Sequence, residues 1–258
     1  MARPEDTMHT TRKTFDVART TGLLYLGLAL TGGIGHLALR ARLFAADDAD
    51  RTLANLVADA GTARAALVLE LGVVVTQALA AVWFFRLFRP VNSVAAAALA
   101  AFGLVNAVAV LVRAACLATA LDAALDPGTV GDAAGTVQAL YLLSGNLWDA
   151  AALFFGLWLL PMGWLVLRSG WMPRALGWAL YAGGLGYLLS VPLGVLLPQA
   201  RAVAEALAFP SVVGEIWMVL HLLIRGGSRH TARGQLAAAA VELGRAGRGA
   251  AVGTSSRG

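Results

Sequence analysis

Cysteine is almost missing from this sequence, and charged residues are scarce. Cys116 is the only cysteine among 258 residues, so neither an internal disulfide nor a metal cluster held by several thiolates can form within one chain. Charged residues make up 14% of the chain and hydrophobic residues 59%, whereas about a quarter of the residues in a typical soluble domain are charged. The composition therefore indicates a membrane protein.

Lysine is also nearly absent, and Lys13 is the only one, although the formal net charge is +5. The excess arginine lies at the ends of apolar segments and in the C-terminal tail. No basic stripe interleaved with aromatic residues occurs, as it would on a nucleic-acid-binding helix. We therefore expect no nucleic-acid partner, and the arginines fit membrane orientation better.

Complete catalytic motifs are missing as well. No serine stands in the context of a nucleophile elbow, and Gly32, Gly33 and Gly35 lie inside an apolar segment without completing a nucleotide-loop pattern. Carboxylates with a histidine can hold a metal, but a closed site needs more histidine or cysteine than this chain offers at useful spacing. The sequence thus predicts no cofactor and no metal, and it favours a protein that is not an enzyme.

Six apolar segments are each long enough to cross a bilayer, which takes about 20 residues. The sequence predicts an all-α fold: a polytopic transmembrane bundle of six spans over residues 20–225, after a polar segment 1–19 and before a disordered tail 226–258. Between the first two spans, apolar residues at helical spacing behind Asp48 predict a short helix on the membrane surface. The spans are predicted at 20–40, 65–86, 93–118, 144–167, 175–197 and 207–225.

Basic residues are sorted between the two ends of the predicted spans. Of the 20 lysines and arginines, fourteen fall on the side of the two termini, and most acidic residues fall on the other side. By the positive-inside rule, both termini are predicted to be cytoplasmic, and the protein to be a multi-pass protein of the cell's inner (plasma) membrane.

Several ionisable and polar residues lie within the spans, where a charge costs about 2.5 to 3.5 kcal/mol. The rise of about 1.5 Å per residue places Glu70 and Arg113 at similar heights in the outer half of the bundle, so we expect an ion pair. Gln77 and Asn106 each stand seven residues away on the same helix faces. The predicted buried polar cluster, for which we expect a ligand-binding role, comprises His36, Glu70, Gln77, Asn106, Arg113, Asn146, Asp149 and Glu215.

Within this cluster, Glu215 is expected either to bond with His36 or to stay protonated because it is buried. The cluster has two interpretations: internal contacts that fix the order of the helices, or a polar pocket in the outer half that binds or moves a small polar or amphipathic ligand. The lipid bilayer is the one partner that the composition requires.

Two other functions stay open at this stage. A non-enzymatic assembly protein would use a stripe of small residues four apart, through which a second copy could approach closely. A membrane-embedded lipid-modifying enzyme would need a nucleophile or metal close to a base. The stripe consists of Ala182, Gly186, Ser190 and Gly194.

One further signal comes from longer runs of residues. The run RSGWMPRALG at 168–177 is the most specific, followed by GLGYL at 184–188 and by Gly214 with Glu215. With these runs the chain resembles, from about residue 18 to 226, a bacterial membrane family described as domain of unknown function 4386. The resemblance implies six helical spans and no assigned activity. It also singles out Glu215 and Glu70, because the family pattern has an acidic residue at the first position and often an aspartate at the second. Many relatives have a histidine where this chain has Ser144, which weakens the prediction of a proton relay or a metal site.

Overall fold

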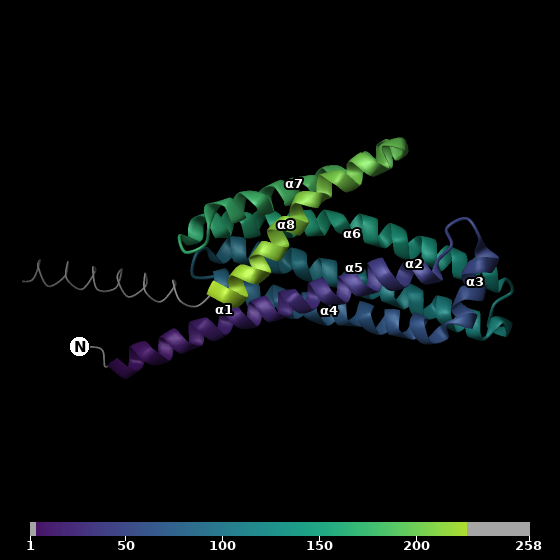
Figure 1. Ribbon diagram of the computed structural model, residues 1–258, viewed down its shortest axis with the longest axis horizontal. Coiled ribbons are helices and arrows are strands. Elements are labelled where there is room, and N and C mark those ends of the chain that lie inside the picture. Colours follow the sequence, from purple (N-terminus) through teal and green to yellow (C-terminus); the bar gives the residue numbers. More distant parts are fainter. Residues whose placement is uncertain (1–3, 226–258) are drawn as a thin grey trace, which may run out of the picture.

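Helices form every regular element in residues 4–225, the part of the chain that the computed structural model describes (Figure 1). Within that part, side chains are described except at 4–16, 36, 37, 198, 201, 204, 205 and 225. The tail predicted to be disordered lies outside the described residues. The elements are α1 (Pro4–Gly32), the π-helix η1 (Gly33–Leu39), α2 (Arg40–Leu43), α3 (Ala49–Ala58), α4 (Ala60–Phe88), α5 (Ser93–Leu125), the 3-10 turn η2 (Pro127–Thr129), α6 (Ala133–Ser169), α7 (Arg174–Leu196), the 3-10 turn η3 (Pro198–Ala200) and α8 (Arg201–Arg225).

Six helical segments in this part are long and apolar enough to cross a membrane. This confirms the predicted fold class, a multi-pass helical bundle; which membrane holds it stays a prediction. α5 has 33 residues and α6 has 37, so each measures about 50 Å or more, against about 30 Å for the hydrocarbon layer. Both helices run past the predicted ends of their spans because the flanking residues are rich in alanine, a strong helix former.

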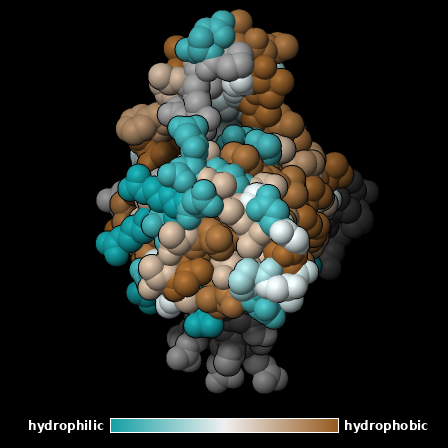
Figure 2. Space-filling model, turned by 90° about the vertical axis from the view of Figure 1, so that its right-hand side faces the viewer, coloured by the Kyte–Doolittle hydropathy of each residue, from teal (hydrophilic) through white to brown (hydrophobic). Residues whose placement is uncertain are grey.

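The bundle has two unlike ends. We call the end with the α4–α5 turn (89–92) and the α6–α7 turn (170–173) the turn end, and the end with α3, η2 and η3 the far end. α1 enters the bundle and α8 leaves it at the turn end (Figure 1). Figure 2 looks onto the far end, where hydrophilic side chains gather beside a hydrophobic flank. That the turn end faces the cytoplasm stays a prediction.

Neighbouring helices follow one another around the bundle, and α8 closes it by packing against both α7 and α1. The centre is aromatic: the ring of Phe84 meets those of Tyr25 and Trp158 edge-on, at centroid distances of 5.2 and 5.6 Å. Gly103 makes room for Trp158, because a Cβ at that position would overlap the indole. These contacts fix the relative positions of α1, α4, α5 and α6.

A second, smaller core lies at the far end, where α3 packs against α5 and α6. Asp48 caps α3 by accepting a hydrogen bond from the backbone N–H of Arg51 at 2.9 Å. Leu56 is fully buried there. The predicted helix therefore exists, with Leu56 packed against protein and Val57 53% exposed; that it lies on the membrane surface stays a prediction. The buried members of this core are Leu43, Leu56, Ala63, Ala120, Leu121, Ala123, Ala124, Val137 and Tyr141.

Asp59 begins α4 in the same way, accepting a hydrogen bond from the backbone N–H of Thr62 at 3.1 Å. Hydrogen bonds from the side chain and backbone of Thr62 lower the pKa of this exposed carboxyl below its usual range. Because the pKa of Asp59 is lower in the folded than in the unfolded state, the cap stabilises the fold fully above about pH 4. This stabilisation is lost as the pH falls through the lowered pKa.

Glycines allow α7 to approach both of its neighbours closely. Gly184 faces the carbonyl oxygen of Gly156 on α6, and Gly186 faces the backbone of Leu207 on α8. Gly186 therefore packs against α8 of the same chain, and only part of the predicted small-residue stripe remains on the outer surface of α7. Gly194 has open space around it, and the association of two copies through the stripe stays a prediction.

Gly170 ends α6 with φ 70°, the one residue with positive φ in the described part of the chain. Alanine disfavours this left-handed conformation, so Gly170→Ala is expected to lower the free energy of unfolding by about 1 kcal/mol. Gly131→Ala serves as a control, because Gly131 lies in an open loop without positive φ. Denaturation followed by tryptophan fluorescence measures both, and equal stability of the two variants would contradict the expectation.

Candidate functional site

Glu70 on α4 and Arg113 on α5 form an ion pair in the far half of the bundle. Nη1 of Arg113 donates to Oε1 of Glu70 at 2.6 Å. Both residues are buried, with 5% and 1% of their surface exposed. α4 and α5 form an antiparallel hairpin, so their equal distance from the α4–α5 turn brings the two side chains to one level. The predicted ion pair is confirmed.

Aromatic rings and a second arginine surround this pair. The guanidinium of Arg113 lies 4.8 Å from the ring centroid of Trp148 on α6, a cation–π contact. Arg40 reaches the same helix, where its Nη1 donates to the Ser144 hydroxyl at 3.0 Å. Arg40 is also close enough to Glu70 to attract it. The site therefore holds two arginines around one buried carboxylate.

Arg40, Ser144 and Trp148 were not predicted as members of the site. Arg40 was expected at the outer end of the first span, but the helix continues through η1 into α2 and carries Arg40 over the rings of Phe44 and Tyr141, at 4.7 and 5.7 Å. A π-helix widens one turn and rotates the rest of the helix about its axis. The glycines at the start of η1 were the signal in the sequence that marked this place.

Three buried oxygen atoms at this site have no hydrogen-bond partner in the described part of the chain: Oε2 of Glu70, Oε1 of Gln77 and Oδ1 of Asn106. Gln77 and Asn106 lie seven residues from the ion pair on α4 and α5, toward the turn end, and are 1% and 0% exposed. Nδ2 of Asn106 donates to the carbonyl oxygen of Ala151 at 3.1 Å. The three acceptors thus follow one seam between α4 and α5, which we call the polar seam.

Two predicted members do not belong to the buried cluster. Asn146 and Asp149 are not buried, so the expectation that they are buried is wrong. The packed face of α6 carries Ser144, Trp148 and Ala151, and helical periodicity turns positions 146 and 149 away from it. The side chain of His36 lies outside the described residues.

Glu215 lies elsewhere in the bundle. Its carboxyl group lies beside the side chains of Tyr25 on α1 and Ser211 on α8, and the Ser211 hydroxyl itself donates to the carbonyl oxygen of Ala208 at 2.8 Å. The ring of Tyr25 contacts Phe84, which is fourteen residues beyond Glu70 on α4, or about 20 Å. The expectation that Glu215 belongs to one cluster with the ion pair is therefore wrong, because α8 packs on α1 and α7 near the turn end.

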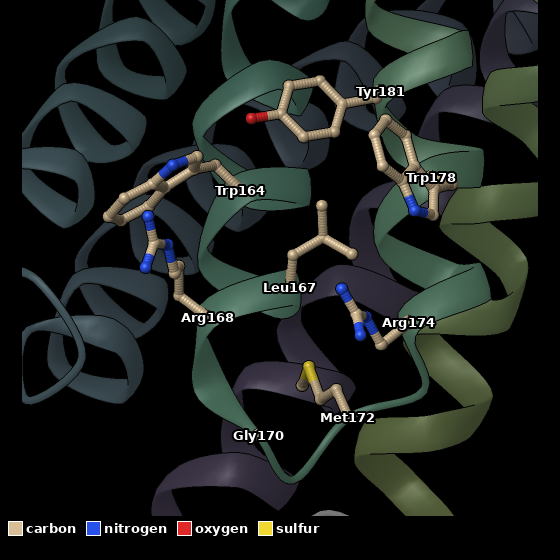
Figure 3. A pocket seen from close by; sticks show the side chains of 8 residues that line it. All are labelled: Trp164, Leu167, Arg168, Gly170, Met172, Arg174, Trp178 and Tyr181. Atoms are coloured by element: carbon tan, nitrogen blue, oxygen red, sulfur yellow. The ribbon is translucent and has the colours of Figure 1, made fainter.

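The structure also has a pocket of about 720 Å³ at the turn end, between α6 and α7 (Figure 3). This is the opposite end from the ion pair, whereas the sequence predicted a pocket in the outer half. Among the described side chains, no three of His, Cys, Asp and Glu gather as metal ligands would. The pocket is lined mainly by Trp164, Leu167, Arg168, Arg174, Trp178 and Tyr181.

A family model described as Domain of unknown function (DUF4386) matches residues 20–226 of the chain. No curated protein and no solved structure matches the chain. The matched range contains the ion pair, the polar seam, the turn-end pocket and all six spans except the first three residues of the first span.

Proposed function

The chain belongs to the DUF4386 family, and we propose that it binds a small polar or amphipathic ligand at the polar seam and the Glu70–Arg113 pair. The observation that carries this proposal is the set of three buried acceptor oxygens without donors in the described part of the chain. A buried polar group without a partner costs about 1 to 3 kcal/mol. A ligand that brings hydroxyl, amide or ammonium donors would remove this cost on binding.

The purely structural alternative accounts less well for the same atoms. An internal network that only fixes helix order is stabilising when all its members are paired. Here the ion pair uses Oε1 of Glu70 and leaves Oε2 without a partner among the described residues. The side-chain NH₂ of Asn106 likewise donates to the carbonyl oxygen of Ala151, while its Oδ1 has no partner among the described residues. The arrangement is therefore rich in acceptors along one line, as a site for a donor-bearing ligand would be.

The approach to this site is proposed from the far end. Arg40 is only partly buried and lies between the ion pair and the far-end core. Its contacts to Ser144 and to the ring of Tyr141 are the ones that a rotamer change could break. In this proposal, Arg40 covers the pair and also offers a charge to an anionic group of an amphipathic ligand.

Native mass spectrometry of the protein extracted in a mild detergent tests the proposal. We expect the wild type to retain one small molecule per chain, and Gln77→Leu to retain it at least tenfold less, because the variant removes one of the three acceptors. Thr76→Val is the matched control: the neighbouring Thr76 hydroxyl donates to the carbonyl of Gly72 in its own helix at 2.7 Å, so the ligand should stay bound.

Two outcomes contradict the proposal. One is a wild-type protein that carries no small molecule under conditions in which it stays folded. The other is a Gln77→Leu variant that becomes more stable and keeps the same bound mass, which would assign the polar seam to helix packing alone. Melting temperature, measured by tryptophan fluorescence on the same samples, shows that each variant is folded.

A further inference from the structure

The turn-end pocket combines positive charge with an apolar, aromatic wall. Arg168 comes from the last turn of α6 and Arg174 is the first residue of α7. The left-handed turn at Gly170 reverses the chain between them, so both arginines line one pocket. Figure 3 shows Arg174 reaching from α7 toward the space beside Leu167, while Arg168 lies against Trp164 on α6.

Both guanidinium groups can still donate hydrogen bonds. The guanidinium carbon of Arg168 lies 5.3 Å from the centroid of the Trp164 ring, and this stacking occupies the face of the group while its N–H donors stay at the edge. Arg174 is exposed. Paired N–H donors of arginine match the oxygens of a phosphate, and Arg174 is the arginine that Figure 3 shows directed into the space beside Leu167. Arg168 adds positive charge on the Trp164 side of the same pocket.

The charge around the pocket is of one sign. Within residues 17–225, basic residues at the turn end include Arg19, Arg86 and Arg89 besides the two in the pocket, and no aspartate or glutamate lies in its turns. Glu215 is the nearest along α8, ten residues before the end of the helix, or about 15 Å. Among the side chains described in residues 17–225, the pocket thus attracts an anion without a competing carboxylate in its turns.

The remaining lining residues suit the body of a lipid. The ring centroids of Trp178 and Tyr181 are 5.8 Å apart, and Trp178 is 63% exposed, as expected for an aromatic residue at the membrane boundary. Leu167 forms the floor between the two arginines (Figure 3). Because the arginines mark the ends of two spans, the pocket lies at the level of lipid headgroups.

From this arrangement we propose that the turn-end pocket is a binding site for an anionic phospholipid. Its phosphate lies at Arg174, Arg168 adds positive charge from the Trp164 side of the pocket, and the first part of an acyl chain lies along Leu167 and Tyr181. The site is at the opposite end of the bundle from the ion pair and does not depend on the function proposed for the polar seam.

The test uses the full-length protein in mild detergent, titrated with phosphatidylglycerol or phosphatidylcholine of the same acyl chains and measured by native mass spectrometry. We expect one phosphatidylglycerol to bind preferentially. Arg168→Gln with Arg174→Gln is expected to weaken it by roughly tenfold or more, the size of the one charge-assisted hydrogen bond lost at Arg174 together with the charge of Arg168.

The matched control is Arg86→Gln with Arg89→Gln. Arg86 also stacks on a tryptophan, 5.1 Å from the centroid of Trp83, and Arg89 is also exposed at a turn of the same end. This variant loses the same charge but leaves the pocket intact, so its lipid preference should persist. Arg174→Gln alone provides a second variant, since an exposed side chain can be replaced without unfolding the protein.

Three results would overturn the proposal. Equal losses in the two double variants would mean that general charge attracts the lipid. Equal binding of both lipids by the wild type would mean that the pocket does not recognise the headgroup. Displacement of the bound lipid by inorganic phosphate at millimolar concentration, with no dependence on acyl chains, would mean that the pocket takes a free anion.

Discussion

Replacing Glu70 with alanine is expected to lower the free energy of unfolding by about 3 to 5 kcal/mol, the largest single effect that we predict. Arg113 would stay buried after losing the carboxylate 2.6 Å away, and a buried charge without its partner is strongly destabilising. Unfolding of the detergent-solubilised protein in increasing SDS measures the effect. Asp149→Ala is the control, because this carboxylate is exposed on α6 and should change stability by less than about 0.5 kcal/mol.

Removing both partners separates pairing from binding. In Glu70→Leu with Arg113→Leu neither charge of the pair remains, and such replacements of a whole pair are often neutral or stabilising. The double variant should therefore regain most of the lost stability but should no longer retain the ligand proposed at the polar seam. Exchange of the two residues, Glu70→Arg with Arg113→Glu, checks the pairing itself: if the exchange recovers no folded protein while each single reversal is damaging, the pair does not stabilise the fold as described.

Substitution of Gly186 by alanine is expected to cost about 1 to 3 kcal/mol, because a new methyl group would overlap the carbonyl oxygen of Leu207. That oxygen belongs to the backbone of α8, so relief requires the whole helix to move away from α7. The melting temperature, followed by tryptophan fluorescence, should fall accordingly.

Gly194→Ala makes the same chemical change two turns further along α7, where a Cβ would meet nothing within 4 Å. The greater helix propensity of alanine should leave this variant unchanged or more stable by up to about 1 kcal/mol. An equal loss in both variants would show that the contact of α7 with α8 does not limit the size of residue 186. If two copies associate through the outer part of the stripe, only Gly194→Ala should also shift the apparent size in gel filtration.

The number of spans and the ion pair could be predicted from the sequence, because they depend on the apolar length of each segment and on the count of residues from one turn. Apolar length decides whether a segment can cross a membrane. Height along the bundle follows from the rise per residue counted from the turn that joins α4 to α5. Glu70 and Arg113 share a hairpin, so equal counts from one turn brought them to one level, and burial then required a partner for each.

Other parts of the site depend on relations between helices that are distant in the sequence. Glu215 lies beside Tyr25 because the last span packs against the first, and nothing within either segment specifies that neighbour. Asn146 and Asp149 were misplaced because the direction in which α6 faces α5 is set by Asn106 and Arg113 on the other helix. The extension of α6 back to Ala133 was missed because hydropathy marks the membrane boundary and not the end of a helix.

The closure of the bundle by α8 against α1 has a consequence for biosynthesis. The chain is synthesised from its N-terminus, so the first five spans exist before the sixth. Tyr25 therefore has no contact with Glu215 until the last span has been made. Gly22 likewise meets Leu222 only at that stage. A chain that still lacks α8 therefore leaves uncovered the side of the first span that faces α8, although α1 can already pack on α4. Docking of the last helix completes the bundle.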